Sequence, residues 1–282
     1  MEGVTVAATD RPTVLRIRSG AMVAGVAGSG LAPPVERAEP PYATLAPYFA
    51  RLFEPRGIRT WFEASQALVA TAGVRGGRHL DVGAGTCRYS RYWARAGFRT
   101  VCLDVLIEML SRARLAGTHG RLARVCGTVD CVRPGAGFDL VTAIDDVVGY
   151  LGAQSGGLES FLERLGPRLR PGGLFLFDLI TPDGRQRYTF RNSRRTAAGR
   201  ITADSRGRFD DETRLLSVDL TLVAADHVAR ERHLLRLYTV EEMEGLLRGA
   251  GFDVLVVTDL YDGPGVGFRA GQPSYDVLAR RR

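Results

Sequence analysis

The sequence predicts an α/β fold, in which a doubly wound, mostly parallel sheet is followed by an antiparallel β insert. Two observations predict it. Between about residues 79 and 177, short apolar segments with strand character alternate with amphipathic stretches of about ten residues, as in right-handed βαβ units. Between about residues 183 and 237 this alternation stops, and strict period-two patterning indicates half-buried antiparallel strands.

The chain before this region divides into two parts. Residues 1–40 are rich in Gly, Ala, Pro and Val without helical or strand periodicity, so we expect a flexible N-terminal extension. Residues 41–282 are expected to form one domain. Apolar residues at spacings of three and four predict an amphipathic helix over 42–53 and a second helix over 59–72.

The remaining elements follow in order. The α/β region predicts strands at 79–82, 99–103, 121–126, 138–143 and 174–177, and helices at 87–96, 106–115 and 161–169. The insert, over 183–237, is expected to hold strands at 200–203, 216–222 and 232–237. A capping box of Thr239 and Glu242 opens a helix through Leu247, and the last strands are expected at 252–257 and 275–279.

Composition excludes several classes of protein. Hydrophobic residues make up 45% and charged residues 24%, which is an ordinary globular balance. The net charge is +7 and all 38 basic residues are arginine, but no block of five like charges forms a stripe for nucleic acid. The four cysteines form no CxxC pair, and no apolar run reaches the roughly 18 residues that span a membrane. We therefore expect a cytoplasmic protein without a metal site, and neither nucleic acid nor a membrane as its partner.

The informative motif is residues 79–87, His-Leu-Asp-Val-Gly-Ala-Gly-Thr-Cys. Gly83 and Gly85 stand in a strand-to-helix turn, where glycine lets the backbone approach a ligand closely. The N–H groups at the start of the next helix suit an anionic group such as a carboxylate. Asp104 ends the second strand, where a carboxylate can accept both hydroxyls of a ribose.

The ligand is nucleotide-like, but a dinucleotide fits the motif poorly. The GxGxxG fingerprint requires glycine at position 88, where this chain has Arg88. Asp81, two residues before the turn, would repel a pyrophosphate and suits a ligand that carries an amino group or a sulfonium. A nicotinamide oxidoreductase is therefore disfavoured.

Residues 80–87 and 101–110 resemble motif I and the acidic end of the second strand in class I S-adenosylmethionine (SAM)-dependent methyltransferases. Residues 138–151, 165–173 and 238–252 are similar to later segments of the same family, in the same order. The resemblance covers about residues 42–282 and implies a Rossmann-like, doubly wound, seven-stranded sheet. The insert looks like that of the small-molecule branch, including amino-sugar N,N-dimethyltransferases of antibiotic pathways.

The resemblance implies SAM as the cofactor and a role for each matching position. Asp81 and the backbone of Gly83, Ala84 and Gly85 should line the methionine part, and Asp104 should hold the ribose hydroxyls. Val105 should lie against the adenine face, with Thr128, Val129 and Asp130 near its amino group and Met109 also at the cofactor. Asp145 should face the methionine amino group or the substrate. One of Tyr42, Tyr48 and Trp61, from a helix over the cofactor, should lie near the methionine carboxylate.

Two positions depart from the family pattern, since Cys87 replaces a frequent third glycine and Thr128 an acidic residue. Three residues are candidates for catalysis: Asp145, Tyr150 and His233. Two of them also have a structural interpretation, since Tyr150 can be a packing residue and His233 a structural histidine in a strand. Tyr42, Tyr48 and Trp61 can likewise be core residues of a helix.

Methyl transfer from a sulfonium is an in-line displacement, so the enzyme mainly positions the acceptor and excludes water. A base is needed only where the acceptor must lose a proton. Because residues 144–147 lack the Pro-Pro-aromatic loop of amino DNA methyltransferases, a small-molecule acceptor is favoured, with N or O of a specialised metabolite as the target. A nucleic-acid base methyltransferase and a non-catalytic SAM-binding protein stay open as alternatives. The family also suggests that the insert covers the acceptor pocket and contributes to subunit contacts, as in a homodimer.

Overall fold

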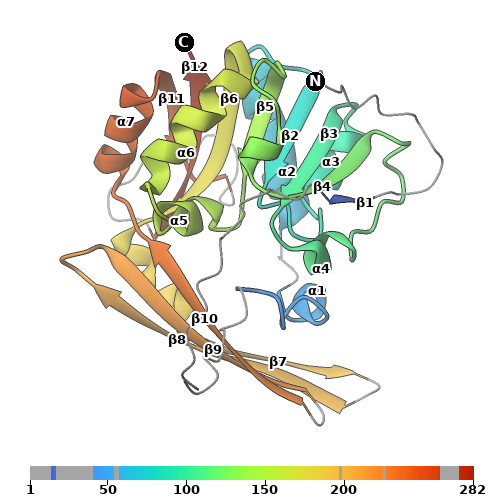
Figure 1. Ribbon diagram of the computed structural model, residues 1–282, viewed down its shortest axis with the longest axis vertical. Helices are drawn as coiled ribbons and strands as arrows, with labels where there is room; N and C mark the ends of the chain where they lie inside the picture. The colour runs from blue at the N-terminus through green and yellow to red at the C-terminus, as the bar shows by residue number, and fades with distance from the viewer. Residues whose placement is uncertain (1–13, 17–40, 54–56, 197–198, 225–226, 261–272) are drawn as a thin grey trace, which may run out of the picture.

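The protein consists of a three-layer α/β/α body and a separate four-stranded sheet that lies below it in Figure 1. The computed structural model describes residues 14–16, 41–53, 57–196, 199–224, 227–260 and 273–282. Apart from one short strand, the expected N-terminal extension lies outside these residues. Among the described helices, none is long and apolar enough to cross a membrane.

The central sheet follows the predicted doubly wound order. It runs β1-β4-β3-β2-β5-β6-β12-β11, with β12 antiparallel to both of its neighbours. Its strands are β1 (Val14–Arg16), β2 (Arg78–Val82), β3 (Arg99–Asp104), β4 (Leu122–Cys126), β5 (Phe138–Ala143), β6 (Leu169–Ile180), β11 (Phe252–Thr258) and β12 (Ser274–Arg281). Without β1, which pairs with the edge strand β4, the sheet has the seven strands that the sequence predicts. The order reverses between β2 and β5, and ligands bind at such switch points, beside the carboxyl ends of the strands.

Helices cover both faces of this sheet. They are α1 (Phe49–Leu52), α2 (Ile58–Thr71), α3 (Ser90–Arg95), α4 (Ile107–Leu110), α5 (Val147–Gly152), α6 (Gly157–Leu165) and α7 (Val240–Gly249), with 3₁₀ turns at Val129–Cys131, Gly166–Arg168 and Pro182–Tyr188. On one face, α6 and α7 bury Phe161 and Leu247 against Phe175 of β6. On the other face, α2 and α3 bury Trp61 and Trp93. The core therefore has two halves, one on each side of the strands.

The insert forms its own antiparallel sheet in the order β10-β9-β8-β7. Its strands are β7 (Phe190–Thr196), β8 (Gly199–Asp210), β9 (Leu215–Ala224) and β10 (His227–Arg236). Leu216, Val218, Leu220 and Leu222 of β9 are buried, as their alternation predicts. The arrangement confirms an antiparallel insert between the fifth strand of the parallel sheet and the last helix. The polar strand β7 was not among the predicted strands.

Three helices differ from prediction. Instead of one helix over 42–53, the chain makes a series of turns over 41–48 and only then forms α1. The physical reason is the carboxylate of Glu231, which accepts the backbone N–H groups of Tyr42, Thr44 and Leu45, while Tyr42 has a φ of +69°. The helices predicted over 87–96 and 106–115 are likewise shorter, because tight turns occupy residues 85–89 and 111–112. The structure adds α5, which the sequence did not predict.

Candidate functional site

Two adjoining cavities lie beside the carboxyl ends of the parallel strands. The first has a volume of about 430 Å³ and is lined by the segments that follow β2, β3, β4 and β5. The second has a volume of about 780 Å³ and extends from β5 and β6 to the insert sheet. Five of the residues that line both cavities are Tyr42, Phe49, Arg88, Asp145 and Tyr150. A molecule in the first cavity therefore shares a wall with a molecule in the second.

The loop after β2 forms one side of the first cavity, as its glycines predict. Gly83 and Gly85 have φ angles of +66° and +53°, which L side chains rarely adopt. A Cβ on Gly83 would lie 2.4 Å from Cγ2 of Val147. Gly83, Ala84 and Gly85 all line the cavity, so the backbone of this loop is presented to a ligand.

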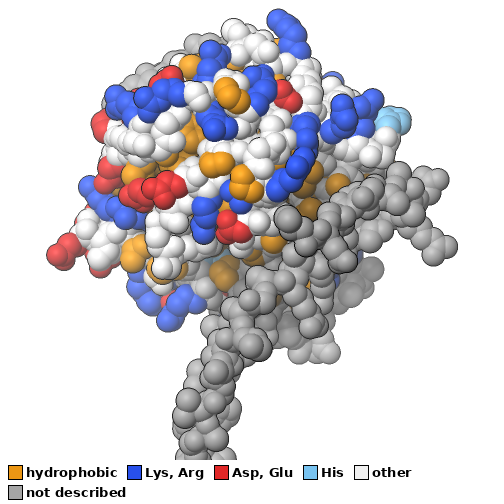
Figure 2. All heavy atoms as spheres, turned by 45° about the horizontal axis from the view of Figure 1, so that its top comes forward, with side chains coloured by type: hydrophobic (Ala, Val, Ile, Leu, Met, Phe, Trp, Pro, Cys, Tyr) orange, Lys and Arg blue, Asp and Glu red, His pale blue; other side chains and the backbone are white. Residues whose placement is uncertain are grey.

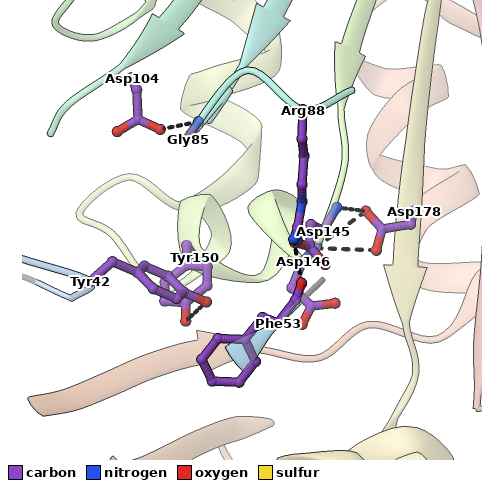
Figure 3. A network of polar contacts seen from close by, with 9 residues as sticks. All are labelled: Tyr42, Phe53, Gly85, Arg88, Asp104, Asp145, Asp146, Tyr150 and Asp178. Carbon is purple, nitrogen blue, oxygen red and sulfur yellow. Dashed lines mark hydrogen bonds and ion pairs between the residues drawn. The ribbon is translucent and has the colours of Figure 1, made fainter. Parts of the chain in front are cut away.

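Asp104 ends β3 and lies beside Gly85 of the same loop (Figure 3). Its carboxylate accepts the N–H of Gly85 and the N–H of Leu106, each at a distance of 2.8 Å. Burial raises the pKa of Asp104, and these two hydrogen bonds oppose the rise. An ionised carboxylate has about four acceptor sites, so two remain for a ligand.

Apolar residues complete the wall next to Asp104. Val105 follows β3 and is 62% exposed, although it is hydrophobic and lines the cavity. Met109 of α4 lines the same cavity and is buried. An apolar wall beside a carboxylate suits a nucleoside, whose ring needs a hydrophobic surface and whose sugar needs acceptors.

The turn after β4 forms the far end of the first cavity. Thr128, Val129 and Asp130 all line it. The Asp130 carboxylate lies 3.5 Å from the guanidinium groups of Arg164 and Arg168, and is half-exposed. Its acceptor capacity is therefore only partly used within the protein.

Three predicted cofactor residues do not line the first cavity. Asp81 is buried beneath the loop, where its carboxylate accepts the hydroxyls of Ser90 and Thr142. Burial raises its pKa to about 6, and the two hydroxyls oppose the rise. Tyr48 packs against the apolar face of the insert. Trp61 lines the second cavity, where its indole N–H donates to Asp276 at a distance of 2.8 Å. Each of these residues thus has a packing or hydrogen-bonding partner outside the first cavity.

A group of carboxylates lies where the two cavities meet. Asp145 and Asp146 follow β5 with φ angles of +77° and +68°, two consecutive strained residues. The carboxylate of Asp178, on β6, accepts both of their backbone N–H groups at 2.9 and 3.1 Å (Figure 3). Burial raises the pKa of Asp178, and it raises that of Asp146 to about 6, with neighbouring carboxylates adding to both.

Arg88 connects the loop after β5 to Phe53 at the end of α1. Its guanidinium donates to the backbone oxygen of Phe53 and to the carboxylate of Asp145 (Figure 3). It also lies over the ring of Phe49, 4.8 Å from the centroid. The sequence indicated Arg88 only as an obstacle to a dinucleotide, and it gave no signal of this bridging role.

The candidate catalytic residues Tyr150 and His233 lie in contact. The Tyr150 hydroxyl is 2.7 Å from Nδ1 of His233 and 2.9 Å from the hydroxyl of Tyr42. On its other side, Nε2 of His233 is 3.1 Å from the Glu231 carboxylate. Asp145 is a separate part of the wall. Glu231 was not predicted, although the period of two places it with His233 and Leu235 on the buried face of β10.

Comparison with known proteins supports the sequence motif. Residues 80–175 match the model of a methyltransferase domain family. No curated protein sequence matches the chain. Among solved structures, a SAM-dependent methyltransferase from Clostridium acetobutylicum is similar with a TM-score of 0.70 and 20% identity, over 85% of this chain and 98% of that one.

Two further structures carry the same fold. The amino pentose methyltransferase CalS10 from Micromonospora echinaspora has a TM-score of 0.62 and 20% identity, over 91% of this chain and all of that one. The sugar N-methyltransferase KedS8 from Streptoalloteichus has a TM-score of 0.65 and 16% identity, over 91% and 98%. At these identities the likeness shows the fold.

The chain therefore carries a methyltransferase domain over residues 80–175 and has the fold of the solved methyltransferases.

Proposed function

We propose that the protein transfers a methyl group from SAM to N or O of a small molecule, a specialised metabolite. The single observation that carries this proposal is the pair of adjoining cavities. One has the glycine loop and carboxylate of a nucleoside site, and the other, of about 780 Å³, is shared between the α/β body and the insert. Their common wall is where a sulfonium methyl and an acceptor atom would meet.

The residues of the first cavity fit SAM. Asp104 retains two acceptor sites for the ribose hydroxyls, and the exposed Val105 offers an apolar surface to the adenine. Thr128 and Asp130 lie at the end of the cavity where the adenine amino group would be. The backbone of Gly83–Gly85 would receive the methionine part, and Asp145 its amino group. When bound, the cofactor supplies an electrophilic methyl group, while the protein orients the acceptor and excludes water.

The size and lining of the second cavity support a small acceptor. Cavities of about 300–1,000 Å³ suit small molecules. Its walls combine carboxylates, among them Asp146 and Asp178, with aromatic rings and with Arg187 and Arg194. This mixture suits a polar acceptor with amino or hydroxyl groups. That two similar folds belong to an amino pentose and a sugar N-methyltransferase supports an amino sugar as one class to test.

A nucleic-acid base is the weaker alternative. A protein that binds nucleic acid needs a continuous basic surface. Figure 2 shows one face of the molecule, on which arginine side chains are scattered among acidic and apolar ones. A non-catalytic SAM-binding protein is the other alternative, and it predicts cofactor affinity without product.

The first experiment is titration calorimetry with S-adenosylhomocysteine (SAH), followed by incubation of the protein with methyl-labelled SAM and separate acceptor panels. The panels are amino sugars, hydroxylated small molecules, transfer RNA and duplex DNA. We expect SAH to bind and label to enter a small molecule. Affinity weaker than millimolar would contradict the cofactor assignment. Label in nucleic acid alone would replace the proposed acceptor, and label in no panel, despite tight SAH binding, would support the non-catalytic alternative.

We also propose that the insert, over 183–237, covers the acceptor cavity of a domain that spans residues 41–282. Of the two cavities, insert residues line the second and not the first, among them Asn192, Arg194 and Val218. A variant in which a short glycine-serine loop replaces residues 190–230 should therefore lose acceptor turnover. A folded variant with unchanged turnover would contradict the proposal. Analytical sedimentation of the intact protein measures its mass in solution and so tests the expected homodimer.

A further inference from the structure

Two carboxyl groups from neighbouring parts of the sheet meet in the wall of the second cavity. Asp146 follows β5, Asp178 lies on β6, and both line this cavity. The backbone N–H of Asp146 lies 3.1 Å from Oδ2 of Asp178, and the two side chains hydrogen-bond each other (Figure 3). Ionised carboxylates only accept hydrogen bonds, so one member of this pair must carry a hydrogen.

The surroundings of Asp178 identify it as the protonated member. Its Oδ1 accepts the backbone N–H groups of Asp145 and Asp146 at 2.9 and 3.3 Å, as the carbonyl oxygen of a neutral acid can. Oδ2 is then the oxygen that carries the hydrogen. Burial raises the pKa of Asp178 well above its ordinary value, and the charges of Asp146, Asp145 and Asp276 add to the rise. The hydrogen therefore belongs to Asp178 and is donated to Asp146.

We propose that Asp146 is the general base that takes the proton of the methyl acceptor, and that Asp178 positions it by donating a hydrogen bond to it. This inference rests on the proposed function, because only a methyl acceptor in the second cavity supplies that proton. Asp146 is the catalytic residue, since its side chain meets the acceptor. Asp178 acts through it.

The backbone of the loop directs its two carboxylates to different partners. Asp145 and Asp146 are consecutive residues with positive φ, and such strain is often found at functional sites. Asp145 lines both cavities, and its carboxylate forms an ion pair with Arg88. Of the two cavities, Asp146 lines the second and not the first. The carboxylate next to the shared wall that has no such cation beside it is therefore on the acceptor side.

The step balances as follows. The new bond forms from the acceptor N or O to the methyl carbon, while the carbon–sulfur bond of the sulfonium breaks and its electron pair stays on sulfur. The acceptor proton moves to the carboxylate of Asp146, so that both members of the pair are then neutral. Asp146 releases this proton to solvent after the product leaves.

The groups around Asp146 suit a base that works near neutral pH. Burial raises its pKa to about 6, and the charge of Asp145 adds to the rise, whereas Tyr188, Arg187 and Asp178 oppose it. Asp146 is therefore ionised above about pH 6, yet it is more basic than an ordinary aspartate. Other titratable or charged groups face the pair from the remaining elements: Tyr42, Tyr150 of α5, Arg236 of β10 and Asp276 of β12.

A test that needs no acceptor is ¹³C NMR of protein labelled at the aspartate carboxyl carbons, titrated with acid and base. Asp146→Asn and Asp178→Asn assign the two signals. We expect the Asp146 signal to titrate near pH 6 and the Asp178 signal to be that of a protonated carboxyl at pH 7. Two ionised carboxyls at pH 7 would overturn the proposal, even if SAH binding and methyl transfer are both found.

The kinetic test uses the small molecule that takes up label in the acceptor panels. Asp146→Asn keeps the shape of the side chain and tolerates the left-handed backbone, but its amide cannot take a proton. Therefore kcat should fall on the order of 10²-fold or more, with SAH affinity within threefold. The acidic limb of the kcat–pH profile, expected near pH 6, should disappear. An Asp146→Asn enzyme with wild-type kcat and an intact limb would overturn the proposal.

Two substitutions of Asp178 test its positioning role. Asp178→Ala removes the hydrogen bond that lowers the pKa of Asp146, so the acidic limb should move to higher pH. Asp178→Asn donates an amide N–H to Asp146 and should bring the limb back. Because Asp178 also accepts two backbone N–H groups, circular dichroism must show that both variants fold. Identical limbs in the two folded variants would contradict the positioning role.

The matched control is Asp253→Asn, which removes an exposed carboxylate of β11 that pairs with Arg282 and lines neither cavity. It should leave kcat and the pH profile unchanged. Absence of SAH binding, or of label in any small molecule, would overturn the proposed function. An intact acidic limb in Asp146→Asn would overturn the assignment of the base alone.

Discussion

The carboxylate of Asp104, at the end of β3, accepts a 2.8 Å hydrogen bond from the backbone N–H of Gly85, nineteen residues earlier in the chain. The same carboxylate accepts the N–H of Leu106. It therefore both holds the glycine loop in place and offers its remaining acceptor sites to the cavity. This double role makes Asp104 the most informative position for cofactor binding.

We predict that Asp104→Ala weakens SAH binding by about 1–3 kcal/mol, because it removes charge-assisted hydrogen bonds to the ribose. Asp104→Asn keeps the shape and should weaken binding less. Titration calorimetry measures both variants. Glu63→Ala is the control, since Glu63 lies on α2 in an exposed ion pair with Arg59, and it should bind SAH like the wild type. Equal affinities for Asp104→Ala and the control would show that the ribose lies elsewhere.

The glycine loop gives a second prediction. Gly83→Ala places a methyl group 2.4 Å from Cγ2 of Val147, a stiff β-branched side chain, and at a φ of +66°. Gly73→Ala carries a similar strain at +91° but meets nothing within 4 Å. Strain alone should lower the free energy of unfolding of either variant by about 1–2 kcal/mol. The clash should cost Gly83→Ala a further 1–3 kcal/mol or so.

Urea unfolding measures these differences, and calorimetry should show weaker SAH binding for Gly83→Ala alone. If the two variants unfold alike and bind SAH alike, the contact between the loop and Val147 does not determine the shape of the cavity.

The parts of the site that the sequence predicts are those built from local patterns. The glycine loop, Asp104 and the helix cap each depend on residues close in the chain or on strand order. Sequence motifs and hydrophobic periodicity are therefore sufficient to predict them. Residues 41–48 fail as a helix because Glu231, nearly 190 residues later, takes their backbone N–H groups. Nothing local to Tyr42 signals that partner.

The helix α5 was missed for a related reason. Its sequence, Val-Val-Gly-Tyr-Leu-Gly, is rich in glycine and β-branched residues and has a low helix propensity. Packing stabilises it, since Val148 is buried in the core and Gly149 lies against Leu235 of β10. Trp61 donates its indole N–H to Asp276 of β12, a partner 215 residues later in the chain that no local pattern indicates. Tertiary partners outweigh local propensity at each of these positions.

The capping box of α7 predicts a change in stability without a change in function. The Thr239 hydroxyl accepts the N–H of Glu242 at 3.2 Å, and the Glu242 carboxylate accepts the N–H of Thr239 at 2.8 Å. Thr239→Ala should lower the free energy of unfolding by about 0.5–2 kcal/mol. Thr71→Ala, near the exposed end of α2, is the control and should change it by less than about 0.5 kcal/mol. A loss of SAH affinity in Thr239→Ala would contradict this purely structural role.

Asp81 predicts how stability depends on pH. Burial raises its pKa to about 6 in the folded protein, from an ordinary value of 3.8. Between these pH values the folded state binds more protons than the unfolded chain, so the free energy of unfolding falls as pH rises. The contribution of Asp81 is therefore fully present below about pH 4 and is lost above about pH 6. The half-buried Asp146 and the buried Asp276, whose pKa values are also raised to about 6, act in the same direction.

Asp81→Asn should reduce this fall and, above pH 6, should make the protein more stable by about 1–3 kcal/mol, the equivalent of a shift of one to two pKa units. The hydroxyls of Ser90 and Thr142 can both partner an amide, because a hydroxyl donates or accepts. Urea unfolding at pH 4.5 and 7.5 measures the effect. Since Asp81 lies beneath the cavity, SAH affinity should change by less than about threefold, whereas a large loss would place its carboxylate in contact with the cofactor.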